Sequence, residues 1–184
     1  MDSYQDIRVL PDPEFNETVL LSALFAKLHR ALAARKAGDI GVSFPHHALT
    51  PGDVLRLHGS RGAIETLEAT GWRSGLNDYC QASIVQAVPA VTAWRTVSRV
   101  QVKSSAERLL RRSVRKGWVT EEEARKRILN IREQRSSLPF IQIKSLSTGQ
   151  AFRLFIYHGA LLSQPAQGEF SRYGLSAEAT IPWF

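Results

Sequence analysis

Apolar residues in the first half of the chain switch between the spacing of strands and the spacing of helices. One set recurs every three or four residues and predicts an amphipathic helix over about residues 16–34. It consists of Leu21, Leu24, Phe25, Leu28 and Leu32. Strand-like runs lie at residues 4–10, 40–44, 54–58 and 82–88. Ile64 and Leu67 indicate a second, short helix that ends near Gly71. The resulting order, βαββαβ, is the ferredoxin-like pattern.

The second half begins after Pro89 and predicts further strands and two helices. The strand-like runs are residues 94–102, 140–144 and 152–157. Ser104 with Glu107, and Thr120 with Glu123, each form a capping box that starts a helix. The apolar end of the tail at 168–184 is expected to pack on the core. We therefore predict an α+β protein, with a ferredoxin-like domain over residues 1–92 and a basic α/β half over 93–184 that contains an arginine-rich helix.

The helix predicted after Ser104 carries cations along one face. They are Arg108, Arg111, Arg112, Arg115 and Lys116. A helix has about 3.6 residues per turn, so these positions fall in a single stripe. Gly117 then suits the left-handed conformation that ends many helices. Parallel cations repel one another unless a polyanion neutralises them, and the stripe therefore favours contact with nucleic acid.

The alternative interpretation of this stripe is a solvated face in which acids alternate with bases. The helix after Thr120 has that pattern, because the glutamates at 121–123 lie four residues before the bases at 125–127. In the arginine-rich helix the only acid is Glu107, near its beginning. The single sign of its charge favours a nucleic-acid face over a solvated one.

Charge is divided unevenly between the two halves of the chain. Residues 1–92 have a net charge of −2 and residues 93–184 of +9, within a total of +7. This asymmetry places an anionic partner on the second half. The single cysteine, Cys80, excludes an intramolecular disulfide, and we interpret it as a small buried hydrophobe. No apolar run is long enough for a membrane span and no signal peptide is evident, so we expect a soluble, cytoplasmic protein without membrane contact.

Few residues have the pattern of a catalytic or metal site. His46 and His47 are adjacent and lack other ligands at metal-binding spacing, so we interpret them as loop histidines. The chain has no P-loop, G-x-G-x-x-G or G-x-S-x-G motif, and any enzyme activity is expected to need no cofactor. His29 lies at the edge of the first helix's apolar stripe, where it is either structural or catalytic. Hydroxyls cluster at residues 144–150, and a tyrosine lies in the glycine-containing segment 173–176.

Motifs spread along the whole chain resemble one known family. They are Asp6-Ile7-Arg8, residues 11–15, Leu28-His29, residues 97–101 with Lys103-Ser104, the arginine-rich helix, residues 121–125, residues 147–150 and the terminal Pro182-Trp183-Phe184. Together they resemble the CRISPR-associated endoribonucleases that process precursor CRISPR RNA. More narrowly, the chain is similar to the subtype I-F member of the Cas-six group.

This resemblance implies a metal-independent cut of a CRISPR repeat hairpin at the 3′ base of its stem. The 2′-hydroxyl attacks the adjacent phosphate, leaving a 2′,3′-cyclic phosphate (or 3′-phosphate) and a 5′-hydroxyl. His29 would be the catalytic imidazole. Ser145 would position the 2′-hydroxyl, and Tyr173 would orient the histidine. The enzyme would act as a monomer on one hairpin, remain on its product and join other subunits of a type I-F surveillance complex.

The resemblance also implies which residues contact RNA. Phe152 would stack beneath the terminal base pair of the stem, and Thr148 would lie near the scissile region. Arg99 and Gln101 would read base edges, since their side chains fit guanine and adenine respectively. The remaining RNA-binding residues would be Lys103, Arg108, Arg111, Arg112, Arg115, Lys116 and Ser147.

Two rival hypotheses stay open at the level of sequence. A non-catalytic subunit that only holds the RNA hairpin would leave His29 structural, and a DNA-binding regulator would use the basic helix on duplex DNA. If His29 is catalytic, it can act as base, acid or both in turn, because imidazole titrates near neutral pH. Leu110 and Lys116 interrupt the arginine face, so we expect weaker binding at the distal end of the stem.

Overall fold

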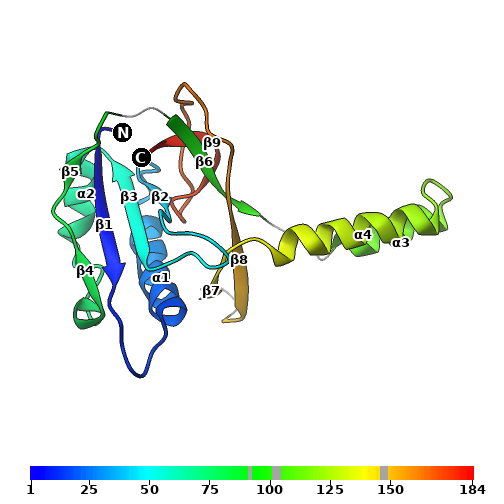
Figure 1. Ribbon diagram of the computed structural model, residues 1–184, viewed down its shortest axis with the longest axis horizontal. Coiled ribbons are helices and arrows are strands. Elements are labelled where there is room, and N and C mark those ends of the chain that lie inside the picture. The colour runs from blue at the N-terminus through cyan, green and yellow to red at the C-terminus, as the bar shows by residue number, and fades with distance from the viewer. Residues whose placement is uncertain (91–92, 101–104, 146–148) are drawn as a thin grey trace.

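The structure is a computed structural model that describes residues 1–90, 93–100, 105–145 and 149–184, without the side chains of residues 105–109 and 130–136. The described chain forms two antiparallel sheets and four α-helices, which agrees with the predicted α+β class. Figure 1 shows the sheets in the body of the molecule and a pair of helices extending away from it. Within the described ranges, no helix is both long and apolar enough to cross a membrane.

The first sheet is built from residues 3–87. Its strands and the helices between them are β1 (Ser3–Val9), α1 (Glu17–Arg35), β2 (Gly41–Ser43), β3 (Val54–Gly59), α2 (Arg61–Glu68), the 3₁₀ turn η1 (Asn77–Tyr79), β4 (Cys80–Ala82) and β5 (Gln86–Ala87). The strands lie in the order β2-β3-β1-β4, and β5 also pairs with β1. All these pairings are antiparallel.

The strand predicted over residues 82–88 is wrong in its extent, because two short strands, β4 and β5, take its place. Their registers against β1 differ by one residue, so the segment between them carries one residue more than the part of β1 that it faces. Ser83 lies at this interruption. Its hydroxyl accepts a hydrogen bond from the Asp6 N–H, and its carbonyl accepts one from the Gln5 side chain.

The second sheet is built from residues after 92. Its elements are β6 (Ala93–Val100), α3 (Ser105–Arg115), α4 (Glu121–Ser136), β7 (Phe140–Lys144), β8 (Ala151–His158) and β9 (Ser176–Trp183). The strands lie in the order β7-β8-β6-β9. The tail therefore packs on the core as expected, but it does so as a strand that the sequence analysis missed. Small residues weaken its apolar pattern, and Pro182 is tolerated because β9 is an edge strand.

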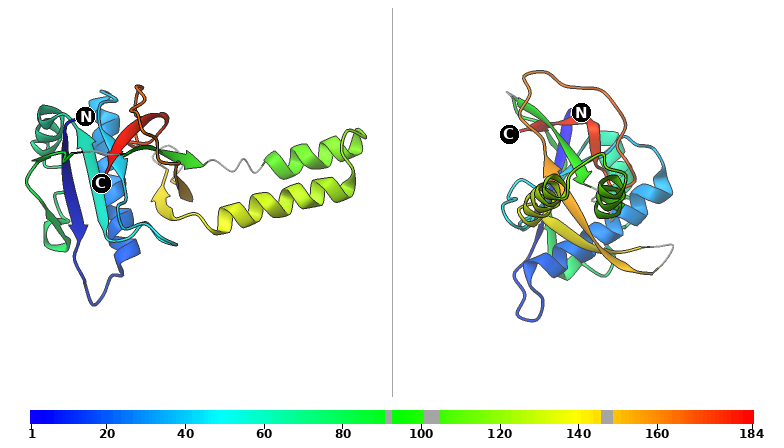
Figure 2. Two further views of the ribbon diagram at one scale, coloured as in Figure 1. Left: turned by 45° about the horizontal axis from the view of Figure 1, so that its top comes forward. Right: turned by 90° about the vertical axis from the view of Figure 1, so that its right-hand side faces the viewer.

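Helix α1 lies between the two sheets (Figure 1, Figure 2) and contacts both of them. One hydrophobic core runs through these layers. It includes Ile7 from the first sheet, Leu24 and Phe25 from α1, and Ile143 and Ile156 from the second sheet. The side of α1 that faces β7 is also tied to it by a hydrogen bond from the Gln142 N–H to the Ser22 hydroxyl. The chain changes sheet near residue 92, but the core continues across that boundary.

Helices α3 and α4 form a hairpin that projects from the second sheet (Figure 2). Helix α3 ends in a Schellman motif, with hydrogen bonds from Gly117 N–H to the Val114 carbonyl and from Trp118 N–H to the Ser113 carbonyl. Gly117 has a φ of 73°, the left-handed conformation that the sequence predicted. The Thr120 capping box at the start of α4 is confirmed. The predicted box at Ser104 lies outside the described residues.

Candidate active site

His29 lies on helix α1, and residues next to each end of this helix determine where it starts and stops. The Asn16 side chain caps the first turn by accepting a hydrogen bond from the Val19 N–H at 2.9 Å, and Lys36 ends the helix in a left-handed conformation. His29 follows Phe25 by one turn and therefore lies on the buried stripe. Its side chain is 8% exposed, which leaves the imidazole at the border between the core and the surface.

Two contacts orient the His29 ring. Its Nδ1 lies 2.9 Å from the carbonyl oxygen of Arg172, and its ring stacks on Tyr173 with the centroids 4.1 Å apart and the planes 9° apart. A carbonyl oxygen can only accept, so Nδ1 carries the hydrogen and donates it. The neutral ring then has its lone pair on Nε2. Tyr173 is itself aligned with Phe25, at 6.4 Å and 4°.

The segment that supplies Tyr173 is held by a tight turn. The Gly174 N–H donates to the Ser171 carbonyl, and the Val42 N–H donates to the Gly174 carbonyl, both at 2.8 Å. Gly174 has a φ of 69°, and a Cβ added to it would lie 2.3 Å from a Val42 methyl carbon. Glycine is therefore required here for both conformation and space. The turn fixes Tyr173 against α1 from a position far along the chain.

The surroundings of His29 keep its imidazole neutral. Burial lowers the pKa of His29 below its ordinary value, and the hydrogen bond to the Arg172 carbonyl opposes this by stabilising the charged form. The charges of Arg172, Arg30 and Arg99 lower the pKa further. The neutral form, which can accept a proton, therefore predominates at neutral pH.

Arg99 connects this histidine to an aromatic ring on the second sheet. Its guanidinium carbon lies 5.3 Å from the centre of the Phe152 ring and 5.5 Å from that of Tyr173. Arg99 lies opposite Ile156 in the β6–β8 pairing, so its side chain extends along β8 to reach Phe152. The structure thus gathers four of the predicted site residues into one group, which we call the His29 cluster: His29, Tyr173, Arg99 and Phe152.

Ser145 lies at the start of the turn that joins β7 to β8. Its N–H donates to the Gln150 carbonyl at 2.8 Å, and its carbonyl accepts from the Gly149 N–H at 2.9 Å. Strand β7 packs on α1, so the turn begins on the strand next to the helix that carries His29. The predicted site residues Gln101, Lys103, Ser147 and Thr148 lie outside the described residues, as does the side chain of Arg108.

The other predicted cations lie on α3 and its C-terminal end, away from the His29 cluster on the projecting hairpin. The side chains of Arg111, Arg112, Arg115 and Lys116 are exposed. None of these four takes part in a salt bridge with another described residue. By contrast, α4 has the pair Lys126–Glu122 at 3.2 Å. Lys116 lies over Trp118, whose side chain is 72% exposed at the tip of the hairpin.

The histidines interpreted as loop residues differ from each other. His46 is exposed and its Nδ1 lies 2.6 Å from Asp53. His47 is half-buried and stacks on His158, with 3.6 Å between the ring centroids. Within the described part of the chain, no three His, Cys, Asp or Glu side chains gather where they could hold a metal ion. Cys80 is buried, and burial raises the pKa of its thiol.

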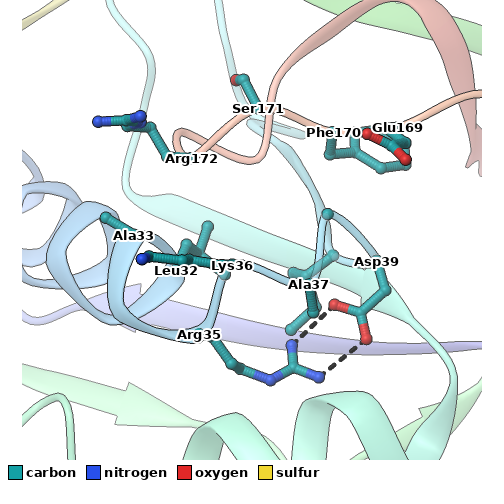
Figure 3. Close-up of a pocket in the computed structure, with 12 residues that line it drawn as sticks. Leu32, Ala33, Arg35, Lys36, Ala37, Asp39, Glu169, Phe170, Ser171 and Arg172 are labelled. Atoms are coloured by element: carbon teal, nitrogen blue, oxygen red, sulfur yellow. Dashed lines mark hydrogen bonds and ion pairs between the residues drawn. The ribbon is translucent and has the colours of Figure 1, made fainter.

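Sequence reasoning missed Arg30 and Arg172, the two arginines closest in sequence to His29 and Tyr173. Their adjacency to two singled-out residues was the available signal. A cavity of about 320 Å³ lies at the C-terminal end of α1, and Arg172 is one of the residues that line it. It is lined by the end of α1, by residues 36–40 that follow it, and by residues 169–172 (Figure 3).

Comparison with known proteins decides the family. The family model for the CRISPR-associated protein Cas_Csy4 matches residues 4–184. This chain belongs to the Cas_Csy4 family. Two relatives named CRISPR-associated endonuclease Cas6/Csy4 are similar over the whole length of both chains: one from Escherichia coli (strain UTI89 / UPEC) at 63% identity and one from Pseudomonas aeruginosa (strain UCBPP-PA14) at 48%. The family resemblance drawn from sequence is therefore confirmed, and the His29 cluster is the candidate active site of a Cas_Csy4 protein.

Proposed function

We propose that this protein is a CRISPR-associated endoribonuclease that binds the repeat hairpin of precursor CRISPR RNA and cleaves it at the 3′ base of the stem. Full-length identity to two curated CRISPR-associated endonucleases supports the activity. The His29 cluster is the observation that carries the proposal, because it joins an imidazole to a guanidinium and an aromatic ring. These three groups suit proton transfer, recognition of phosphate or guanine, and base stacking respectively.

His29 is the proposed general base. Its Nδ1–H is engaged by the Arg172 carbonyl, and Nε2 has no hydrogen-bond partner among the described residues. Nε2 takes the proton of the ribose 2′-hydroxyl, and the 2′-oxygen bonds to phosphorus as the bond from phosphorus to the 5′-oxygen breaks. The leaving 5′-oxygen takes a proton from the imidazolium or from solvent. The products are a 2′,3′-cyclic phosphate and a 5′-hydroxyl.

The remaining site roles are proposed from the family resemblance together with the described positions. Phe152 stacks beneath the last base pair, and Arg99, which lies over that ring, reads a guanine edge or binds a phosphate. Ser145, at the β7–β8 turn, positions the 2′-hydroxyl. Gln101, Lys103, Ser147 and Thr148 contribute further RNA contacts on this proposal.

The basic stripe on α3 is proposed to grip the stem. Its exposed cations face solvent without salt bridges to described residues, as a surface that meets phosphates requires. The major groove of A-form RNA is narrow, but long arginine side chains can enter it from the open end of a short hairpin. Residues 1–92 would form a ferredoxin-like domain and residues 93–184 the RNA-binding domain. The protein would bind one hairpin as a monomer and join other subunits of a type I-F surveillance complex in the cytoplasm.

Replacement of His29 by Ala tests the catalytic role. We expect cleavage of a repeat hairpin in single-turnover assays to fall by about 10²–10⁴-fold, the usual contribution of a general base, while hairpin affinity is largely kept. His46→Ala is the matched control, because His46 is an exposed histidine on a loop. Cleavage that survives in His29→Ala would remove the imidazole from the mechanism and favour a subunit that only holds the hairpin.

A substrate with deoxyribose at the cut site tests the nucleophile. We expect cleavage to stop while binding changes little, because the substitution removes only the attacking hydroxyl. Addition of EDTA should leave the rate on the ribose substrate unchanged. Loss of activity in EDTA would show that a metal ion takes part in the reaction.

A further inference from the structure

Two exposed arginines adjoin His29, one through the sequence and one through a hydrogen bond. Arg30 follows His29 directly on α1, and Arg172 supplies the carbonyl that accepts the hydrogen of Nδ1. The charges of Arg172, Arg30 and Arg99 all lower the pKa of His29. Neither Arg30 nor Arg172 forms a salt bridge with another described residue. Exposed guanidinium groups of this kind are available to an anion.

The cavity at the end of α1 adds a third cation to this pair. Arg172 and Lys36 both line it. In Figure 3, Arg35 is held by Asp39, whereas Lys36 and Arg172 have no partner among the residues drawn. Glu169 is the other acid on the lining. Among the described residues, Lys36 and Arg172 are the cations of this lining without an ion-pair partner, and Glu169 is one carboxylate that is likewise unpaired.

A continuous series of contacts leads from Phe152 to this cationic site. Arg99 lies over both Phe152 and Tyr173, Tyr173 stacks on His29, and His29 bonds to Arg172, which lines the cavity. If Phe152 supports the stem and His29 acts at its 3′ base, as the proposed function requires, an RNA strand that continues past the cut reaches Arg172 next.

We propose that Arg30, Arg172 and Lys36 bind the phosphates of the single-stranded RNA on the 3′ side of the cleavage site. Guanidinium groups bind phosphate oxygens through paired hydrogen bonds, and a lysine adds a point charge. This strand is present in the substrate and departs after cleavage. The site therefore favours uncut RNA and does not contribute to retention of the cut hairpin.

Affinity measurements with two RNAs test this site. One is a hairpin with six nucleotides 3′ of a deoxyribose cut site, and the other is the hairpin that ends at the cut. Each phosphate contact on a single strand contributes about 0.7 to the slope of log affinity against log salt concentration. Loss of one contact therefore lowers the affinity at 0.1 M salt by about fivefold, measured relative to the affinity at 1 M salt. We expect Arg172→Ala to show this loss on the extended RNA and none on the cut hairpin. Arg61→Ala, which removes an exposed arginine on α2, is the control of equal charge.

The design separates this site from a structural role of Arg172. Substitution at this position keeps the backbone carbonyl that binds His29, and Arg172→Lys should restore most of the salt slope because it restores the charge. Lys36→Ala should repeat the selective loss. An equal loss on both RNAs, or no loss on either, would overturn the strand site. A wild-type protein that binds neither RNA would instead overturn the proposed function on which this inference rests.

Discussion

His29 meets two requirements that usually conflict in one side chain. The first requirement is burial, which lowers the pKa of His29 and fixes its ring. The second is access to Nε2, and this atom does not belong to the buried, unpartnered polar atoms of the described residues. The hydrogen bond to a carbonyl sets the tautomer, and the stack on Tyr173 sets the plane of the ring. A base at this position is therefore oriented before RNA binds.

The stack predicts different outcomes for two substitutions of Tyr173. Tyr173→Phe keeps the ring that stacks on His29 and is aligned with Phe25, and it should retain cleavage within a few-fold of wild type. Tyr173→Ala removes it and should lower the single-turnover rate by about tenfold or more, because the imidazole loses its orientation. Affinity for the cut hairpin reports whether the fold persists. Equal loss in both variants would assign the role to the phenolic hydroxyl instead.

At the scale of elements, α3 and α4 lie side by side in the hairpin but have contrasting surfaces. The stripe on α3 has one sign of charge, whereas α4 begins with glutamates that pair along the helix, as Glu122 does with Lys126. The Thr120 capping box starts α4, and Gly117 in its left-handed conformation ends α3. Among the side chains of the hairpin that the structure describes, α3 therefore presents the surface suited to a polyanion.

This contrast predicts how salt affects RNA binding. Arg112→Ala should reduce the slope of log affinity against log salt by about 0.7–0.9, since one phosphate contact is lost. Arg125→Ala on α4 is the matched control and should leave the slope unchanged. The measurement is hairpin affinity at several salt concentrations. Equal slopes in the two variants would contradict the assignment of the RNA face to α3.

At the scale of the whole molecule, each sheet carries one histidine that is removed from solvent, His58 completely and His158 in part. His58 of β3 is completely buried, its Nε2 lies 2.8 Å from the Ser43 hydroxyl, and its Nδ1 has no partner. His158 of β8 packs against His47 and Trp183. Burial lowers the pKa of each to about 3. Both rings are neutral in the folded protein at neutral pH.

This burial predicts acid sensitivity of the fold. An unfolded histidine has a pKa of about 6.5, so below that pH the unfolded chain takes up protons that the folded protein excludes. The stability contributed by neutral His58 and His158 is complete above pH 6.5 and is lost as the pH falls toward about 3. Each should add about 1.4 kcal/mol per pH unit to the decline in the free energy of unfolding.

Denaturant unfolding at several pH values measures this decline. The double variant Ser43→Ala, His58→Leu replaces both partners of the buried hydrogen bond. It should reduce the decline in the free energy of unfolding by about 1.4 kcal/mol per pH unit, the contribution of one histidine. Ser43→Ala alone, which keeps the buried His58, should leave the decline unchanged. An unaltered decline in the double variant would show that His58 is protonated without cost to the fold.

Features that depend on neighbours in the chain were determined by the sequence alone. The period of apolar residues defined α1, the Thr120 box and Gly117 defined helix ends, and the stripe on α3 followed from spacing. Each of these signals acts within a few residues, where helix geometry dictates which side chains meet. The extents of β4, β5 and β9 were missed because strands of small or polar residues are stabilised by partners elsewhere in the chain.

The His29 cluster was decided by tertiary structure. His29 and Arg172 are 143 residues apart and meet only because β9 pairs with β6 and the segment before it turns back onto α1. From sequence, His29 was either structural or catalytic, and the family resemblance rather than its spacing pointed to a site. Its tautomer depends on the carbonyl of Arg172, and its ring reaches Arg99 through Tyr173, so both depend on contacts between distant segments that no local pattern encodes.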